Sequence, residues 1–95
     1  METKERYFVQ ESGGVDTFAD ERAILSLLEG KAISADIHDE KNRTVKSLST
    51  ETPSLDTVKE ILSLCDKAKG WAEVRAMDPA SGKTITYSIE NVKNI

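Results

Sequence analysis

Residues 54–77 read SLDTVKEILSLCDKAKGWAEVRAM, and the period of their apolar residues changes at Gly70. Before this glycine, apolar side chains recur at the spacing of one helix face: Leu55, Val58, Ile61, Leu62, Cys65 and Ala68. After it, residues 71–77 alternate as a strand does. Ser54 is a good helix N-cap, and glycine commonly ends helices. The stretch predicts a helix over about 55–69, ended by Gly70, that leads directly into a strand over 71–77.

The rest of the chain predicts a second helix and four further strands. Alternating, β-branched or aromatic segments predict strands at Arg6–Glu11, Ile33–His38, Arg43–Leu48 and Lys83–Glu90. A helix is expected from about Phe18 to Glu29, with Asp16 or Thr17 as its N-cap and Gly30 just after its end. Turns are expected at residues 39–42 and 78–82, because Asp, Pro and Gly favour tight turns.

The two halves of the chain resemble each other. The segment Ile24–Leu27 reads ILSL, and Ile61–Leu64 repeats it. Each copy is followed by a glycine, a strand, an Asp that opens a turn, and a triplet of a basic residue, Thr and a β-branched residue. One helix-plus-hairpin unit cannot bury its apolar faces alone, whereas two units on a common sheet can. We therefore expect an α+β fold of two layers, with one mainly antiparallel sheet of up to five strands and two helices on one face (β-α-ββ-α-ββ), and a possible internal αββ repeat.

Length and charge exclude several classes of protein. The chain has 95 residues and a net charge of −4, and we expect residues 1–95 to form a single domain. The acidic excess lies in residues 1–30, where seven acidic side chains face three basic ones. A grip on the nucleic-acid backbone needs clustered Lys and Arg, so a nucleic-acid partner is disfavoured. No apolar run approaches the ~18 residues of a membrane span.

Residue types that carry cofactor or metal chemistry are scarce. Cys65 is the only cysteine and His38 the only histidine, which excludes an internal disulfide and a thiolate zinc cluster. We expect no metal site and no cofactor. The segment Met1–Arg6 lacks the apolar region of a secretory signal, so a reduced, cytoplasmic location is expected.

The candidate binding residues are Trp71, Arg75, Asp36 and His38. If Ala72, Val74 and Ala76 face the helices, Trp71 and Arg75 lie on the opposite face of the sheet. Asp36 and His38 are two residues apart on their strand and share that face. A large exposed aromatic ring among polar side chains is typical of a contact surface. In the alternative interpretation, Trp71 is tucked over a sheet edge or the alternation runs the opposite way.

Three other patterns have simpler interpretations. Asp36 and His38 could form a general base with its orienting carboxylate, but nothing like a nucleophile or oxyanion loop accompanies them, so a polar strand face is favoured. Cys65 falls in the apolar stripe of its helix, where a thiol is an inert core group. Gly13–Gly14 precedes a helix, but no Lys-Ser/Thr follows and the acidic side chains nearby would repel a phosphate.

These observations favour a small, acidic, non-enzymatic protein-interaction module, such as an inhibitor, an immunity-type protein or a phage accessory protein. Its partner would be another protein or, in a weak homodimer, a second copy. Such contacts would use the sheet face, the acidic N-terminal region or an edge strand, and Lys83–Glu90 is expected to be the less protected edge. The alternative is a single-stranded nucleic-acid binder that uses the open sheet face, with Trp71, Arg75, Tyr87 and Lys46 supplying stacking and charge.

Overall fold

Helix α2 (Leu55–Ala68) and strand β5 (Trp71–Met77) form where the change of period predicts them. The Ser54 side chain accepts a hydrogen bond from the backbone N–H of Thr57, and the Thr57 side chain accepts one from the N–H of Ser54. This capping box satisfies backbone donors that the first turn of a helix leaves without partners. Ser54 is thus the N-cap that the sequence predicts.

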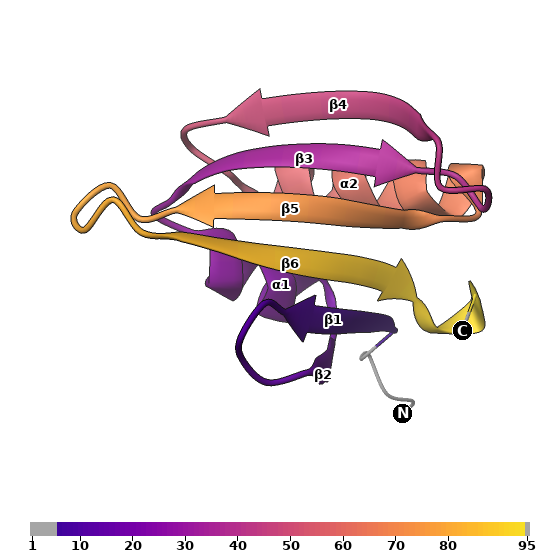
Figure 1. Ribbon diagram of the computed structural model, residues 1–95, viewed down its shortest axis with the longest axis horizontal. Helices are drawn as coiled ribbons and strands as arrows, with labels where there is room; N and C mark the ends of the chain where they lie inside the picture. The colour runs from indigo at the N-terminus through magenta and orange to yellow at the C-terminus, as the bar shows by residue number, and fades with distance from the viewer. Residues whose placement is uncertain (1–5, 95) are drawn as a thin grey trace.

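The computed structural model describes residues 6–94, in which six strands form one antiparallel sheet (Figure 1). Their order across the sheet is β2-β1-β6-β5-β3-β4. The other strands are β1 (Tyr7–Glu11), β2 (Thr17–Ala19), β3 (Ala32–His38), β4 (Thr44–Thr50) and β6 (Thr84–Asn91), followed by a short 3-10 helix, η1 (Val92–Asn94). Helix α1 (Glu21–Leu28) and α2 both lie on one face of the sheet. The predicted two-layer α+β fold is confirmed, with one strand more than expected.

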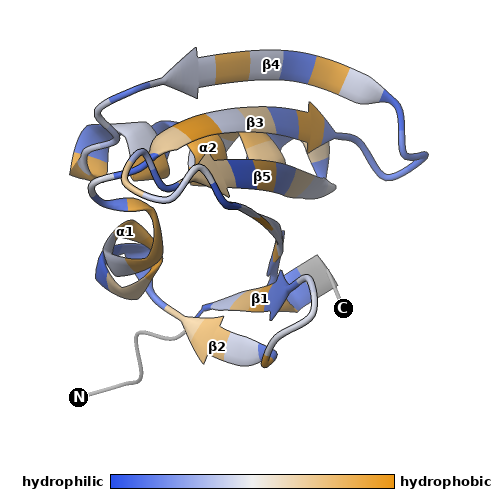
Figure 2. Ribbon diagram, turned by 60° about the vertical axis from the view of Figure 1, so that its left-hand side comes forward, coloured by the Kyte–Doolittle hydropathy of each residue, from blue (hydrophilic) through white to orange (hydrophobic). Residues whose placement is uncertain are grey.

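The core lies between the helices and one face of the sheet. Along β3 and β5, hydrophobic and hydrophilic residues alternate, so that each of these strands turns one apolar row toward the helices (Figure 2). Leu62 and Cys65, the predicted core positions of α2, are 2% and 0% exposed. The buried apolar residues on these elements are Ile33, Ala35, Ile37, Ala72, Val74, Ala76, Ile24, Leu28, Val58, Ile61, Leu62 and Cys65.

Helix α1 begins later than the sequence predicts. Its N-cap is Asp20, whose side chain accepts a hydrogen bond from the N–H of Ala23 at 2.8 Å; neither Asp16 nor Thr17 caps it. Residues Thr17–Ala19 form β2 instead. The expected helix start at Phe18 is therefore wrong. The aromatic and β-branched residues there pair with β1, and this pairing satisfies the backbone before the helix begins.

The edges of the sheet also differ from expectation. Strand β6, which contains most of the segment predicted to be a poorly protected edge, lies between β1 and β5, and β1 covers residues 87–91 of it. This happens because the N-terminal strand pairs along β6, from Tyr7 opposite Asn91 to Glu11 opposite Tyr87. Within residues 6–94, the edge strands are β2 and β4. Strand β4 is the predicted return strand, which carries Lys46.

Two αββ units follow one another along the chain, α1-β3-β4 and α2-β5-β6. Their first strands, β3 and β5, are antiparallel neighbours, and their second strands, β4 and β6, lie on the outer sides of this pair. A shift of 39 residues relates Asp39 to Asp78, the two residues that open the hairpin turns. The same shift relates Ala35 to Val74, and these two residues are direct partners in the ladder. This is the placement that an approximate two-fold axis through the β3–β5 pair requires.

Residues Met1–Glu5 and Ile95 lie outside the described residues. The expectation about a secretory signal falls on this N-terminal segment. Between Arg6 and Asn94, neither helix has the length and apolar character needed to cross a membrane.

Candidate functional site

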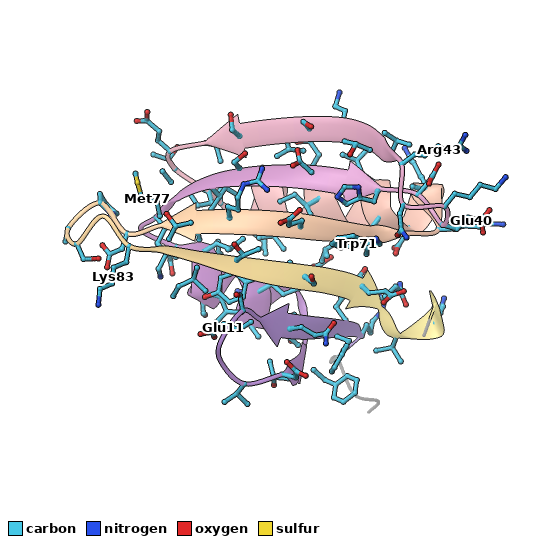
Figure 3. The ribbon with its side chains drawn as sticks, in the orientation of Figure 1. Glu11, Glu40, Arg43, Trp71, Met77 and Lys83 are labelled. Carbon is cyan, nitrogen blue, oxygen red and sulfur yellow. The ribbon has the colours of Figure 1, made fainter. Side chains whose placement is uncertain are left out.

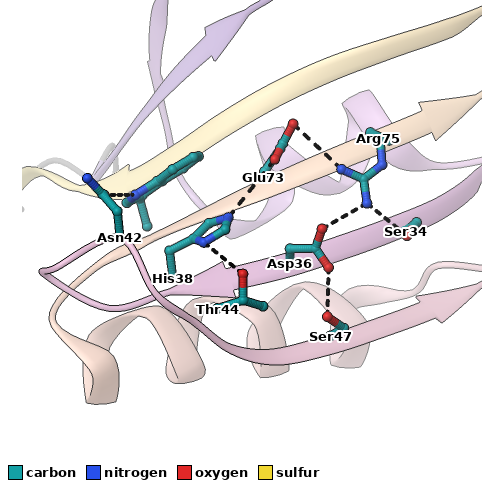
Figure 4. Close-up of polar contacts among 9 residues, drawn as sticks. Ser34, Asp36, His38, Asn42, Thr44, Ser47, Glu73 and Arg75 are labelled. Carbon is teal, nitrogen blue, oxygen red and sulfur yellow. Dashed lines mark hydrogen bonds and ion pairs between the residues drawn. The ribbon is translucent and has the colours of Figure 1, made fainter.

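The site lies on the sheet face opposite the helices, which we call the open face. Alternation along β3 and β5 turns Asp36, His38, Trp71 and Arg75 to this face, as the sequence predicts. Because β3 and β5 are neighbours, His38 lies opposite Trp71 and Asp36 lies opposite Glu73. The structure therefore brings the four predicted residues together on two adjacent strands (Figure 4).

Trp71 is half-buried, whereas the binding-surface hypothesis drawn from the sequence expects an exposed ring. Its indole ring stacks on the imidazole of His38, with ring centroids 4.4 Å apart and 26° between the planes. Its Nε1 donates a hydrogen bond to Oδ1 of Asn42 at 2.9 Å. An indole N–H that is partly buried generally needs such a partner. These two contacts cover part of the ring and fix its orientation.

Asn42 reaches Trp71 from the turn between β3 and β4. The Asp39 carboxylate accepts hydrogen bonds from the backbone N–H groups of Arg43 and Lys41, both at 2.9 Å. These bonds, that of Arg43 above all, hold the pKa of Asp39 below its ordinary value. Asn42 has φ of 64°, a left-handed conformation that Asn tolerates better than most residues. The turn therefore presents the Asn42 amide to the indole in a defined geometry.

Gly70 allows the connection from α2 to β5 to approach the end of β3. A Cβ atom at Gly70 would lie 1.8 Å from the carbonyl oxygen of His38. Lys69 takes the left-handed conformation that ends α2, with φ of 57°. The glycine predicted as a helix stop is therefore required for a close backbone contact. That contact places Trp71, the next residue, against His38.

Arg75 is the centre of a charged network on the open face. Its Nη2 donates to Oδ2 of Asp36 at 2.9 Å, and its Nη1 lies 3.6 Å from Oε2 of Glu73. The other Asp36 oxygen accepts a hydrogen bond from the Ser47 hydroxyl at 2.7 Å. The Ser47 hydroxyl, then the Arg75 guanidinium, hold the pKa of Asp36 below its ordinary value. Because these side chains are partly exposed, the network orients Arg75 more than it stabilises the fold.

His38 does not pair with Asp36. Its Nδ1 lies 3.2 Å from the Thr44 hydroxyl, and its Nε2 lies 4.0 Å from Oε1 of Glu73. This Nε2 is buried and has no hydrogen-bond partner in the described part of the chain. The hydrogen bonds of Asp36 go to Arg75 and Ser47. A general base oriented by Asp36 is therefore not assembled by these contacts.

A hollow of about 370 Å³ opens beside Trp71. Gln10 from β1, Ser88 and Glu90 from β6, and Asn42 complete its lining. Glu90 is the direct ladder partner of Trp71. Figure 3 shows Trp71 near the end of the sheet that carries Glu40 and Arg43, away from Met77 and Lys83. This hollow could not be predicted from the sequence, because only the strand order brings β1, β6 and the β3–β4 turn together around Trp71.

Two further aromatic rings extend the open face toward β2. Phe8 and Phe18 are partners in the β1–β2 ladder, and their ring centroids are 5.1 Å apart. Phe8 is also the partner of Glu90. A row of side chains therefore crosses the sheet in the order Phe18, Phe8, Glu90, Trp71 and His38. This row was not apparent from the sequence, because Phe18 was expected to begin a helix.

Two of the four residues considered for nucleic-acid binding lie away from the open face. Tyr87 is 4% exposed and is the ladder partner of Val74, on the helix side of the sheet. Lys46 is the partner of Ile37 and lies on that side as well. The assignment of these two residues to the open face is wrong, because the alternation along β6 and β4 turns them the other way.

In residues 6–94, no three His, Cys, Asp or Glu side chains are grouped so that they could hold a metal ion. Comparisons with protein-family models, with curated proteins and with solved structures found no match.

Proposed function

We propose that the protein is a small acidic interaction module, without enzymatic activity, that contacts a partner protein through its open face. The observation that supports this function is that the Trp71–His38 stack and Arg75 share a sheet face that no helix or strand of residues 6–94 covers. Trp and Arg are among the residues most often found as binding anchors in protein interfaces. An inhibitor, an immunity-type protein or a phage accessory protein fits the size and charge, by analogy only.

The arrangement of the open face suits recognition of a preformed surface. Trp71 is held by His38 and Asn42, and Arg75 is held by Asp36 and Glu73. Side chains that are already ordered lose less conformational entropy when a partner binds. A partner would therefore meet two oriented anchors on the same face of β5, with Glu73 between them.

The test is differential capture of partners from extracts of cells that express the protein. Ser88→Lys places a long side chain on the open face and leaves the Trp71 contacts in place, and Trp71→Ala removes the central ring. Glu60→Lys changes the exposed surface of α2 and is the control. We expect a partner that the wild-type and control proteins retain and both open-face variants lose. A partner that only the control variant loses, or that all three variants retain, would show that the contact lies elsewhere on the protein.

A second copy of the chain is the alternative protein partner. Edge strands offer unpaired backbone groups to another strand, and β4 has seven residues with a single charged side chain, Lys46. Sedimentation over a range of concentrations tests this form of association. The wild-type protein and a Ser47→Pro variant, which blocks strand addition, are compared. Association that Ser47→Pro abolishes would identify β4 as the contact.

Single-stranded nucleic acid is the second candidate ligand. The Trp71–His38 stack and the Phe8–Phe18 pair on the same face supply aromatic surfaces on which bases could stack. Three acidic side chains, Asp36, Glu73 and Glu90, oppose this function on the open face. A titration of Trp71 fluorescence with oligothymidine distinguishes the two functions. A shift that weakens strongly with salt would favour nucleic acid over a protein partner.

A further inference from the structure

The hollow beside Trp71 has an aromatic ring on one side and a carboxylate on the other. In the strand order, His38 on β3 covers one side of Trp71, and the hollow opens on the other side, toward β6 and β1. Glu90 is the ladder partner of Trp71, and side chains at such positions are about 5 Å apart at Cβ. The indole N–H is already bound to Asn42, which also lines the hollow, so a ligand would find the π-surface of the ring and not a free N–H donor.

Charge on this face favours a cation. In residues 6–94, Glu90 forms no ion pair, and the side chains that line the hollow include no Lys or Arg. Glu73 lies on the same face two residues from Trp71, and the whole chain carries a net charge of −4. Trp is the aromatic side chain that binds cations best over its face. A cation placed here would meet the indole and the Glu90 carboxylate together.

The same face already holds one guanidinium group, between two carboxylates and, within residues 6–94, without an aromatic ring. Arg75 lies between the carboxylates of Asp36 and Glu73, at 2.9 and 3.6 Å. A planar guanidinium can stack on an indole and at the same time donate two hydrogen bonds to one carboxylate, which a compact ammonium group cannot do. The hollow of about 370 Å³ accommodates an arginine side chain with accompanying water.

We propose that this hollow binds an arginine side chain presented by the partner protein, with the guanidinium between the indole of Trp71 and the carboxylate of Glu90. This inference rests on the proposed function, because it names the chemistry of the partner's anchor. It also makes Glu90 a specificity-determining residue. An arginine would be selected over a neutral side chain of the same shape.

The test uses a short peptide with one central arginine, and the same peptide with citrulline or lysine in its place. Trp71 is the only tryptophan, so fluorescence and the indole N–H signal in NMR spectra report directly on the hollow. We expect the arginine peptide to shift both signals and to bind about tenfold more tightly than the neutral citrulline peptide. The lysine peptide should bind with intermediate affinity.

Two variants with equal charge change separate the hollow from general electrostatics. Glu90→Gln removes the proposed carboxylate, and Glu60→Gln removes a carboxylate from the exposed surface of α2. We expect Glu90→Gln to weaken binding of the arginine peptide about tenfold. Glu60→Gln should change the affinity for this peptide by less than about twofold. Equal binding of the arginine and citrulline peptides, or equal effects of the two variants, would overturn the proposal.

The outcome is separable from that of the proposed function. If the arginine peptide fails to shift the Trp71 signals while open-face variants still lose a captured partner, the anchor is not arginine and the interaction face stands. If the peptide binds but no partner depends on the open face, the hollow is a cation site without the proposed protein partner.

Discussion

At the scale of single residues, Cys65 shows how burial controls chemistry. Its side chain is 0% exposed in the middle of α2, and burial, with smaller contributions from nearby carboxylates, raises the pKa of the thiol to about 12. The thiolate is the reactive form, so the native protein should react with thiol reagents only as fast as it opens. We expect slow labelling in buffer and immediate labelling in denaturant, followed by absorbance. Rapid labelling of the native protein would contradict the core position.

Asp36 gives a prediction about pH. Its pKa lies below the ordinary value of 3.8, first because Ser47 donates a hydrogen bond and then because of Arg75. A depressed pKa in the folded state stabilises the fold above the unfolded value, and this contribution is lost as the pH falls through the folded value. We expect Ser47→Ala to raise the pKa of Asp36 in a carboxyl NMR titration and to make the acid loss of stability smaller.

The matched control for this prediction is Ser49→Ala. Ser49 lies on the same strand and face as Ser47, and its ladder partner is Ser34 rather than Asp36. The Ser49→Ala variant should leave the pKa of Asp36 in the NMR titration unchanged. A shift of equal size in both variants would show that the Ser47 hydrogen bond does not control this carboxylate.

The sequence predicts only the part of the candidate site that follows from the alternation of side chains along each strand. Period-2 alternation fixes which side chains share a sheet face, so Trp71, Arg75, Asp36 and His38 were assigned to one face. Alternation carries no information on which strands are neighbours. The contacts of Trp71 with Asn42 and Glu90 depend on strand order, and the left-handed turn at Asn42 depends on hydrogen bonds to Asp39. These residues could not be assigned without the structure.

At the scale of elements, the start of α1 can be tested with two aspartates. Asp20 accepts the capping hydrogen bond from Ala23, whereas Asp16 is exposed before β2. We expect Asp20→Ala to lower the free energy of unfolding by about 1 kcal/mol, the usual effect of losing an N-cap. Asp16→Ala removes the same charge and should change it by less than about 0.5 kcal/mol. Urea unfolding measures both, and equal losses would contradict the assigned cap.

The connection from α2 to β5 is tested with two glycines. Gly70→Ala would drive a Cβ atom into the His38 backbone, which cannot move without disturbing the β3–β5 pair, and we expect a loss of about 3 kcal/mol or more. Gly30 has φ of 81° and open space around it, so Gly30→Ala should cost only about 1 kcal/mol of conformational strain. Thermal unfolding measures both. A tolerated Gly70→Ala would mean that the two segments are not in contact.

Most elements were predictable because their patterns are long. The fourteen residues of α2 and the seven of β5 each complete several periods, so their type and limits follow from periodicity. Strand β2 has three residues, less than two periods, and Phe18 continues the apolar pattern of the helix that follows. Short strands gain stability from their partner and not from local pattern. The pairing of β2 with β1 was therefore invisible in the sequence.

At the scale of the whole molecule, the strand order decides which surfaces can meet a partner. Pairing of β1 with residues 87–91 of β6 covers most of what would otherwise be an edge and leaves β2 and β4 as the edge strands within the described residues. Strand β4 is long and mostly exposed, whereas β2 has only three residues. Backbone contacts with a partner would therefore use β4, and side-chain contacts would use the open face beside it.

Hydrogen exchange followed by NMR tests this order across the molecule. An amide in an interior strand is bonded to a neighbour on one side and shielded by another strand on the other, so its exchange requires opening of the sheet. We expect the amides of β3, β5 and residues 87–91 of β6 to exchange slowly, and those of β2 and the outward-facing amides of β4 to exchange fast. If residues 87–91 exchanged as fast as β4, β6 would be an edge and the N-terminal strand would not pair there. Phe8→Pro, which removes a backbone donor that β1 turns toward β6, should accelerate exchange in β6 and leave β4 unchanged, because β6 and β4 are separated by β5 and β3.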